Sequence, residues 1–177
     1  MKRIVLVGHS LAGNVLPVLA ELRPDLFHRL VYVSCSIPLP GQTVVQMMGR
    51  GLQGAVENEV GWPVDPDTTQ TRDRYEIMYC NDMSEAQKAT FLPNLELDAW
   101  PMKFFTATDF RFRNLDLVPA TYVVCLTDRA LSVAWQEKFA ERLHAKRLVR
   151  IDAGHQAMIT RPHALAEVLR DEAKTGR

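Results

Sequence analysis

A serine near the start of the chain stands in a context that could make it a nucleophile. Ser10 lies within the sequence Gly-His-Ser-Leu-Ala-Gly (residues 8–13), directly after the apolar run 4–7 and directly before a helical pattern. A tight turn between a strand and a helix needs small flanking residues and leaves a serine hydroxyl projecting at the edge of a sheet. The pattern therefore predicts that Ser10 can attack a carbonyl carbon.

Two residues far along the chain could activate this serine. A serine hydroxyl is a weak nucleophile and needs a base, which in turn needs a third group to orient it. Asp128 and His155 supply these residue types, and each follows an apolar run that predicts a strand. The carboxyl ends of parallel strands meet at one edge of a sheet, which is where open α/β sheets place their sites. We therefore expect Ser10, Asp128 and His155 to lie close together.

Plainer interpretations of these residues are also open. Ser10 could be an ordinary capping serine at a helix start, and His155 could be a histidine of a surface loop. Three other aspartates compete for the position of the acid: Asp109, Asp116 and Asp152. Asp128 is favoured over them because it directly follows a predicted strand.

Two further residues are candidates for contact with a substrate. Met158 comes shortly after His155 and is expected in the wall of a pocket. His9 adjoins Ser10 and could act as a second base, although packing behind the turn is the interpretation that we favour. The cysteines, Cys35, Cys80 and Cys125, are too widely spaced for a zinc site or a disulfide framework, so we expect no metal and no cofactor.

The elements that must position these residues predict the α/β fold class. Four β-branched or apolar runs predict buried parallel strands with flanking helices, at 3–7, 30–33, 122–126 and 148–151. A helix is expected over 11–22, where Pro17 should produce a kink or mark the helix start. We divide the chain into a core of residues 1–37 and 118–177 and a mostly helical cap, residues 38–117.

Composition excludes several classes of partner. The chain has 177 residues, 47% of them hydrophobic, which is enough for one domain with a real core. Its 21 basic and 21 acidic residues cancel, so nothing indicates binding to nucleic acid or to an anionic membrane. Without a signal sequence or a run of 18 apolar residues, the expected location is cytoplasmic.

The chain resembles the α/β-hydrolase superfamily, and within it the small esterases and methylesterases related to plant hydroxynitrile lyases. Three motifs in order carry the resemblance: residues 5–13, 121–128 and 152–158. The resemblance implies hydrolysis of small carboxylic esters. Ser10 would be the nucleophile, His155 the base, Asp128 its orienting acid and the Leu11 amide the oxyanion donor.

The chain departs from that family in ways that change the expectation. Gln156 stands where the hydroxynitrile lyases carry lysine, which favours ester hydrolysis over lyase chemistry. Family members have about four strands before the nucleophile, so the chain looks truncated at its N-terminus and lacks the loop that supplies the second oxyanion donor. An inactive hydrolase that binds small molecules is the alternative. An unpaired first strand also predicts a homodimer through that edge.

Overall fold

Four parallel strands form the sheet that carries the predicted site residues. The computed structural model describes residues 4–97, 102–109 and 112–174. The strands lie side by side in chain order: β1 (Ile4–His9), β2 (Phe27–Val33), β3 (Ala120–Cys125) and β4 (Arg147–Ile151). The α/β class and the four parallel strands are thus confirmed. Because every strand runs the same way, all four carboxyl ends meet at one edge of the sheet.

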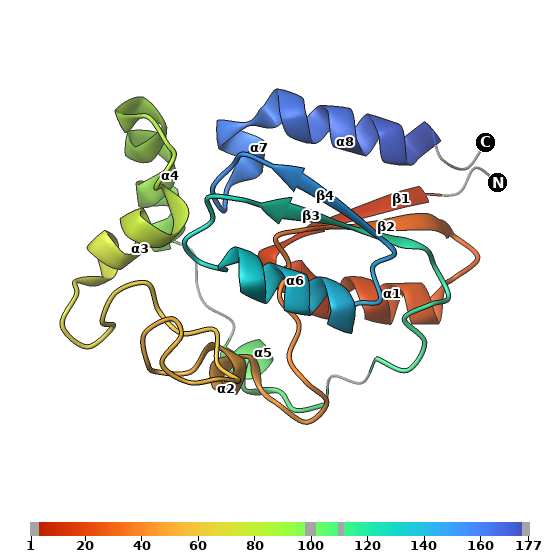
Figure 1. Cartoon of the computed structure of the whole chain (residues 1–177), viewed down its shortest axis with the longest axis horizontal. Helices are drawn as coiled ribbons and strands as arrows, with labels where there is room; N and C mark the ends of the chain where they lie inside the picture. The colour runs from red at the N-terminus through yellow and green to blue at the C-terminus, as the bar shows by residue number, and fades with distance from the viewer. Residues whose placement is uncertain (1–3, 98–101, 110–111, 175–177) are drawn as a thin grey trace.

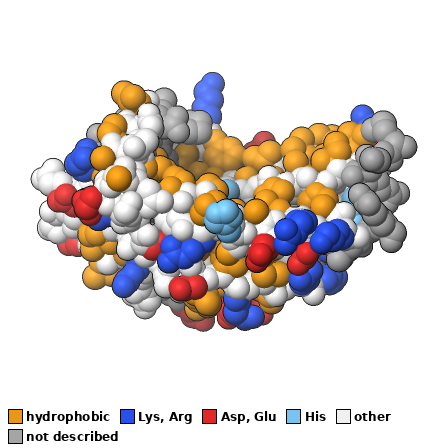
Figure 2. All heavy atoms as spheres, turned by 90° about the horizontal axis from the view of Figure 1, so that it is seen from above, with side chains coloured by type: hydrophobic (Ala, Val, Ile, Leu, Met, Phe, Trp, Pro, Cys, Tyr) orange, Lys and Arg blue, Asp and Glu red, His pale blue; other side chains and the backbone are white. Residues whose placement is uncertain are grey.

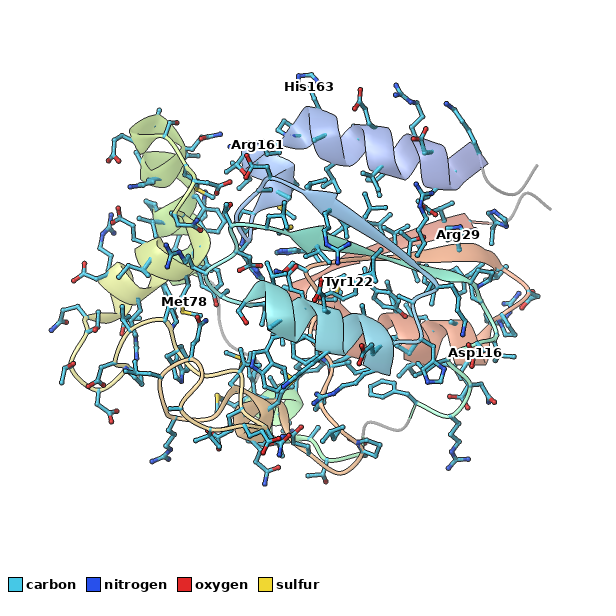
Figure 3. The ribbon with its side chains drawn as sticks, in the orientation of Figure 1. Arg29, Met78, Asp116, Tyr122, Arg161 and His163 are labelled. Atoms are coloured by element: carbon cyan, nitrogen blue, oxygen red, sulfur yellow. The ribbon has the colours of Figure 1, made fainter. Side chains whose placement is uncertain are left out.

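Helices cover both faces of the sheet (Figure 1). The helices α1 (Leu16–Leu22) and α6 (Val133–Arg142) pack on one face, and α7 (Ala157–Thr160) and α8 (Pro162–Lys174) lie on the other. The core is accordingly split into two layers. Tyr122 belongs to the α6 layer, where its hydroxyl donates to the Cys35 carbonyl at 2.6 Å (Figure 3), and Val123 belongs to the α8 layer.

The helix expected over 11–22 is divided in two. Residues Ser10–Asn14 form a short 3-10 helix, and α1 begins only at Leu16. Pro17 lies in the first turn of α1, where a missing backbone N–H leaves no helical hydrogen bond unmade. Pro17 therefore marks the helix start, which was one of the two expected outcomes, whereas the expected beginning of the helix at residue 11 was wrong.

A buried carboxylate fastens α8 to the amino ends of the strands. Glu172 is fully buried, and its carboxylate pairs with Arg29 of β2 at 3.0 Å and Arg147 of β4 at 2.8 Å. It also accepts a hydrogen bond from Thr121 of β3. Arg29 lies under the C-terminal half of α8 in Figure 3. This ion cluster is at the opposite end of the sheet from Ser10, so it stabilises the fold rather than the site.

The helices between β2 and β3 lie toward the carboxyl ends of the strands, and the chain then returns to the amino end of β3 (Figure 1). The described helices of this segment are α2 (Val44–Met48), α3 (Thr71–Tyr79), α4 (Glu85–Leu97) and α5 (Met102–Thr106). Ser84 caps α4, because Ser84 Oγ accepts from the Gln87 amide while the Gln87 side chain accepts from the Ser84 amide. We call this segment, residues 38–117, the cap.

None of the helices within the described ranges is both long and apolar enough to cross a lipid bilayer. Seen from the side of α8, charged side chains gather over this helix, and hydrophobic side chains form a band along the far margin (Figure 2). The paired charges of α8 include Arg170 with Glu167 and Lys174 with Asp171.

The strand β1 is an apolar edge of the described sheet. Ile4 and Val7 are 46% and 42% exposed, and the neighbouring helix α1 exposes Val18, Leu19 and Leu22. An unpaired apolar edge is a template for pairing with another chain, and a lysine blocks such pairing. We expect the wild type to form dimers in light scattering after gel filtration, and Val7→Lys to be monomeric. Leu148→Lys, on the opposite edge strand β4, should leave the dimer intact; a monomeric wild type would contradict the prediction.

Candidate active site

Ser10 lies at a strained turn between β1 and the 3-10 helix. Its φ is 55°, a left-handed conformation that non-glycine residues rarely adopt and that often marks functional sites. The turn packs tightly against the chain after β2, where the Ser36 amide donates to the Ser10 carbonyl at 3.0 Å. Gly13 is required here because a Cβ atom would clash with the Ser36 carbonyl. The turn thus has the features of a nucleophile elbow.

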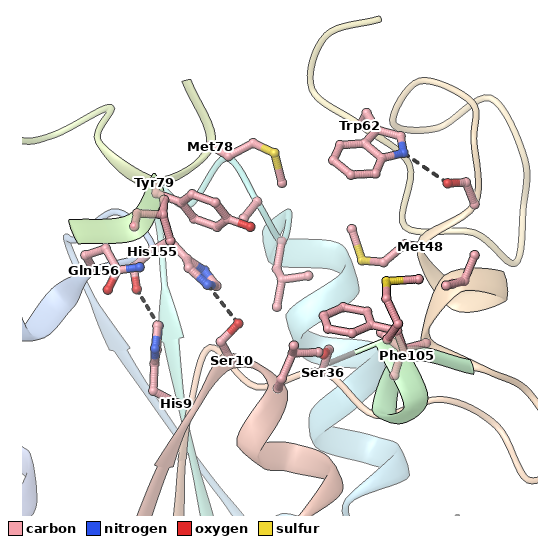
Figure 4. A pocket seen from close by; sticks show the side chains of 18 residues that line it. His9, Ser10, Ser36, Met48, Trp62, Met78, Tyr79, Phe105, His155 and Gln156 are labelled. Carbon is pink, nitrogen blue, oxygen red and sulfur yellow. Dashed lines mark hydrogen bonds between the residues drawn. The ribbon is translucent and has the colours of Figure 1, made fainter. Parts of the chain in front are cut away.

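Ser10, His155 and Asp128 form one line of hydrogen bonds. His155 Nδ1 lies 2.7 Å from Asp128 Oδ2, and His155 Nε2 lies 3.0 Å from Ser10 Oγ (Figure 4). A carboxylate can only accept, so Nδ1 carries the proton and Nε2 of the neutral ring accepts from the Ser10 hydroxyl. The three residues that the sequence singled out are therefore brought together, in the arrangement that a base-activated serine requires.

The Asp128 carboxylate has hydrogen-bond donors on both oxygens. Oδ1 accepts from the Ala130 and Leu131 amides at 2.7 and 2.9 Å, and Oδ2 accepts from Ser34 Oγ at 2.5 Å as well as from His155. Burial alone would raise the pKa of this carboxyl. The neighbouring His155 and these hydrogen bonds outweigh burial and hold the Asp128 pKa below its ordinary value. The group is therefore an anion at neutral pH and fixes the His155 ring.

Sequence reasoning missed Ser34 as a partner of the acid. Ser34 directly follows β2 and has a φ of 40°. It reaches Asp128 because the carboxyl ends of β2 and β3 are adjacent. The signal was present in the sequence, since Ser34 follows a strand just as Asp128 does.

His9 packs behind the site and holds the backbone of His155. Its Nε2–H donates to the His155 carbonyl at 2.8 Å, and the two rings lie 4.6 Å apart between centroids. Burial, then repulsion from His155, lowers the pKa of His9 from 6.5 to about 3. His9 is thus neutral and packed against His155. This arrangement favours the interpretation of His9 as a packing residue over its interpretation as a second base.

This burial of His9 predicts acid destabilisation. The unfolded chain takes up a proton on His9 below pH 6.5, whereas the folded chain does so only near pH 3, so stability is lost as pH falls through this range. The free energy of unfolding falls by up to about 1.4 kcal/mol for each pH unit in this range. Urea unfolding at about pH 7.5 and about pH 5 measures how much the free energy of unfolding falls between the two pH values. This fall should be smaller for His9→Gln than for wild type, by about 2 kcal/mol. Equal pH dependence in both proteins, with the exposed His163→Gln as control, would contradict this.

An apolar cavity of about 430 Å³ opens in front of Ser10 and His155 (Figure 4). The core contributes His9, Ser10, Leu11, Ser36 and Gln156 to its wall, while the cap contributes aromatic and thioether side chains, which are Met48, Trp62, Met78, Tyr79, Met102 and Phe105. The Tyr79 hydroxyl points into the cavity. Burial raises the pKa of Tyr79 well above its ordinary value, so this hydroxyl is a neutral donor at working pH.

Met158 is not part of this cavity. It lies on α7, is 39% exposed and is absent from the cavity wall, so the prediction that it contacts substrate is corrected. Met158 is the second residue of α7, which begins at Ala157, immediately after Gln156. Gln156, its near neighbour in sequence, does line the cavity.

No cluster of three histidine, cysteine or acidic side chains suited to a metal ion occurs among the described residues. The three cysteines are free and buried. Burial raises the pKa of the Cys125 thiol to about 12, which makes it inert as a nucleophile.

A parallel sheet with a strained serine turn, a histidine and a buried aspartate at its carboxyl edge is the layout of the α/β-hydrolase class of proteins. The model of the alpha/beta hydrolase family matches residues 1–168, and the chain belongs to this family. The resemblance seen in the sequence is thus confirmed.

Known proteins similar to the chain are longer. Norfluorocurarine synthase 1 of Strychnos nux-vomica is 25% identical, over 97% of this chain and 70% of the relative. Among solved structures, an extracellular alpha/beta-hydrolase from a Paenibacillus species matches with a TM-score of 0.75 at 21% identity, covering 98% of this chain and 73% of that one. A pyrethroid hydrolase from Sphingobium faniae matches with a TM-score of 0.68 at 20% identity, covering 98% and 71%. These structural matches show the fold.

Proposed function

We propose that the protein hydrolyses small carboxylic esters with Ser10 as the nucleophile. The observation that carries the proposal is the continuous hydrogen-bonded line from Ser10 through His155 to Asp128 at the floor of the apolar cavity. Names among the similar structures, a pyrethroid hydrolase and a methylesterase from Arabidopsis, support ester chemistry. Among the described residues, the cavity wall has no Asp, Glu, Lys or Arg side chain, which favours neutral, apolar esters.

The proposed reaction begins when Ser10 Oγ attacks the ester carbonyl carbon and His155 Nε2 takes its proton. Asp128 stabilises the imidazolium through Nδ1–H, and the Leu11 amide, next to the nucleophile, donates to the oxyanion. When the tetrahedral intermediate collapses, the His155 proton goes to the departing alcohol and leaves an acyl group on Ser10. Water, deprotonated by His155, then hydrolyses the acyl-enzyme and regenerates the serine.

Active-site labelling and turnover together test this function. A fluorophosphonate should label the folded chain in a time-dependent manner and not the heat-denatured chain, because only a base-activated serine reacts. The same protein should hydrolyse p-nitrophenyl acetate and butyrate. Labelling without turnover would favour the inactive binding protein, and release of cyanide from acetone cyanohydrin would favour a lyase. An absence of both labelling and turnover would overturn the proposal.

A further inference from the structure

The cap touches the two loops that carry Asp128 and His155 through a pair of adjacent residues. The helix α3 ends at Tyr79, and Asn81 and Asp82 follow in the turn before α4. Both side chains reach out of the cap to main-chain atoms of the core. Neither residue drew attention in the sequence, because each looks like an ordinary polar turn residue.

Each of these two side chains makes a hydrogen bond to the residue directly before Asp128 or His155. Asn81 Nδ2 donates to the Thr127 carbonyl at 2.8 Å, one residue before Asp128. Asp82 Oδ2 accepts from the Gly154 amide at 2.7 Å, one residue before His155. The two loops are also bonded to each other, since the Thr127 amide donates to the Ala153 carbonyl at 3.0 Å.

Close packing makes the contact at Gly154 specific. A Cβ atom at position 154 would clash with the Asp82 carboxylate, so glycine is needed for the approach. Tyr79 adds a contact one step further along, with its ring 5.4 Å from the His155 ring (Figure 4). Tyr79 and Asp82, at the two ends of this segment, thus both contact the His155 loop.

The Asp82 carboxylate is costly for stability. Its second oxygen, Oδ1, is buried without a hydrogen-bond partner among the described residues. A buried carboxylate oxygen that makes no hydrogen bond is destabilising. Natural proteins accept such a loss of stability mainly at functional sites. The unbonded oxygen of Asp82 is therefore expected if Asp82 has a role in the site that outweighs its cost to stability.

We propose that Asn81 and Asp82 are positioning residues. These two residues of the cap fix the loops of Asp128 and His155 in position relative to each other. The proposal rests on the proposed function, because it assigns these residues a part in the same reaction. Neither side chain lines the cavity, so they act through main-chain hydrogen bonds and not through substrate. A cap that is displaced would release both loops at once and lengthen the contact from His155 to Ser10.

The test separates this role from substrate binding. With p-nitrophenyl butyrate, Asp82→Ala should lower kcat about 10- to 100-fold and leave KM within about threefold, because misplacing a catalytic group by ~1 Å costs on this scale. Asp82→Asn keeps an oxygen that accepts from the Gly154 amide, and its kcat should stay within about threefold of wild type. Asn81→Ala should lose about tenfold in kcat. Asp73→Ala, an exposed aspartate on α3, is the matched control and should match wild type.

A measurement that needs no turnover completes the design. The proton on His155 Nδ1, bonded to Asp128, should give a low-field NMR signal in wild type and Asp82→Asn that broadens in Asp82→Ala. Full kcat and an unchanged signal in Asp82→Ala would overturn the inference, as would a raised KM at constant kcat, or an Asp82→Asn as slow as Asp82→Ala. If Asp82→Ala does not fold, the exposed Asn81→Ala decides by the same readouts. An ester hydrolase activity that survives Ser10→Ala would instead overturn the proposed function alone.

Discussion

Replacing Ser10 by alanine is expected to reduce kcat for p-nitrophenyl butyrate by a factor on the order of 10⁶. The substitution removes the oxygen that lies 3.0 Å from His155 Nε2 and leaves no other nucleophile in that position. The fold should persist, because among the described residues the hydroxyl is hydrogen-bonded to His155, and alanine adds no atom to the turn. Initial rates and fluorophosphonate labelling measure the effect, and both should vanish together.

A serine elsewhere in the fold provides the matched control. Ser132 caps α6, where its Oγ accepts from the Trp135 amide, and it is not among the residues that line the cavity. Ser132→Ala should lower the free energy of unfolding by about 1 kcal/mol and leave kcat unchanged. If Ser10→Ala retained a rate within tenfold of wild type while Ser132→Ala behaved as expected, a serine mechanism at this site would be wrong.

The strands and the line Ser10–Asp128–His155 could be predicted because their signals are local. Each strand contains a short run of apolar residues, and Ser10, Asp128 and His155 follow within four residues of the ends of β1, β3 and β4. Parallel strands then bring those ends to one edge without any knowledge of side-chain packing. The order of the elements thus determines which residues meet, although not the distances at which they meet.

The contacts made by the cap could not be predicted in this way. Asn81 and Asp82 meet Thr127 and Gly154 across 46 and 72 residues of sequence, and only the packing of α3 against the core brings them there. For Met158, in contrast, a place in the cavity wall was predicted that the structure does not show. It is close to His155 in sequence, yet it is not in the cavity wall, because nearness along a chain does not set the direction of a side chain.

Replacing Asp128 by asparagine is expected to reduce kcat by about 10⁴-fold while preserving the shape of the site. An asparagine Oδ1 still accepts from the Ala130 and Leu131 amides. The amide nitrogen then faces His155 Nδ1 and donates to it, so the imidazole proton moves to Nε2. An Nε2 that carries a proton cannot accept the proton of Ser10, and the base is lost although the ring stays in place.

Two comparisons make the Asp128 result decisive. Asp152→Asn is the matched control, because Asp152 lies three residues before His155, is exposed and was a competing candidate for the acid; its kcat should equal that of wild type. The double variant Ser10→Ala with Asp128→Asn should be no slower than Ser10→Ala alone, since residues that act as one unit lose their effects together and not additively. A further loss in the double variant would mean that Asp128 acts on substrate or stability apart from Ser10. If the kcat of Asp128→Asn were close to that of wild type, His155 would be oriented chiefly by its other contacts. These include the hydrogen bond from His9 to its carbonyl and the contact of the Tyr79 ring with its imidazole ring.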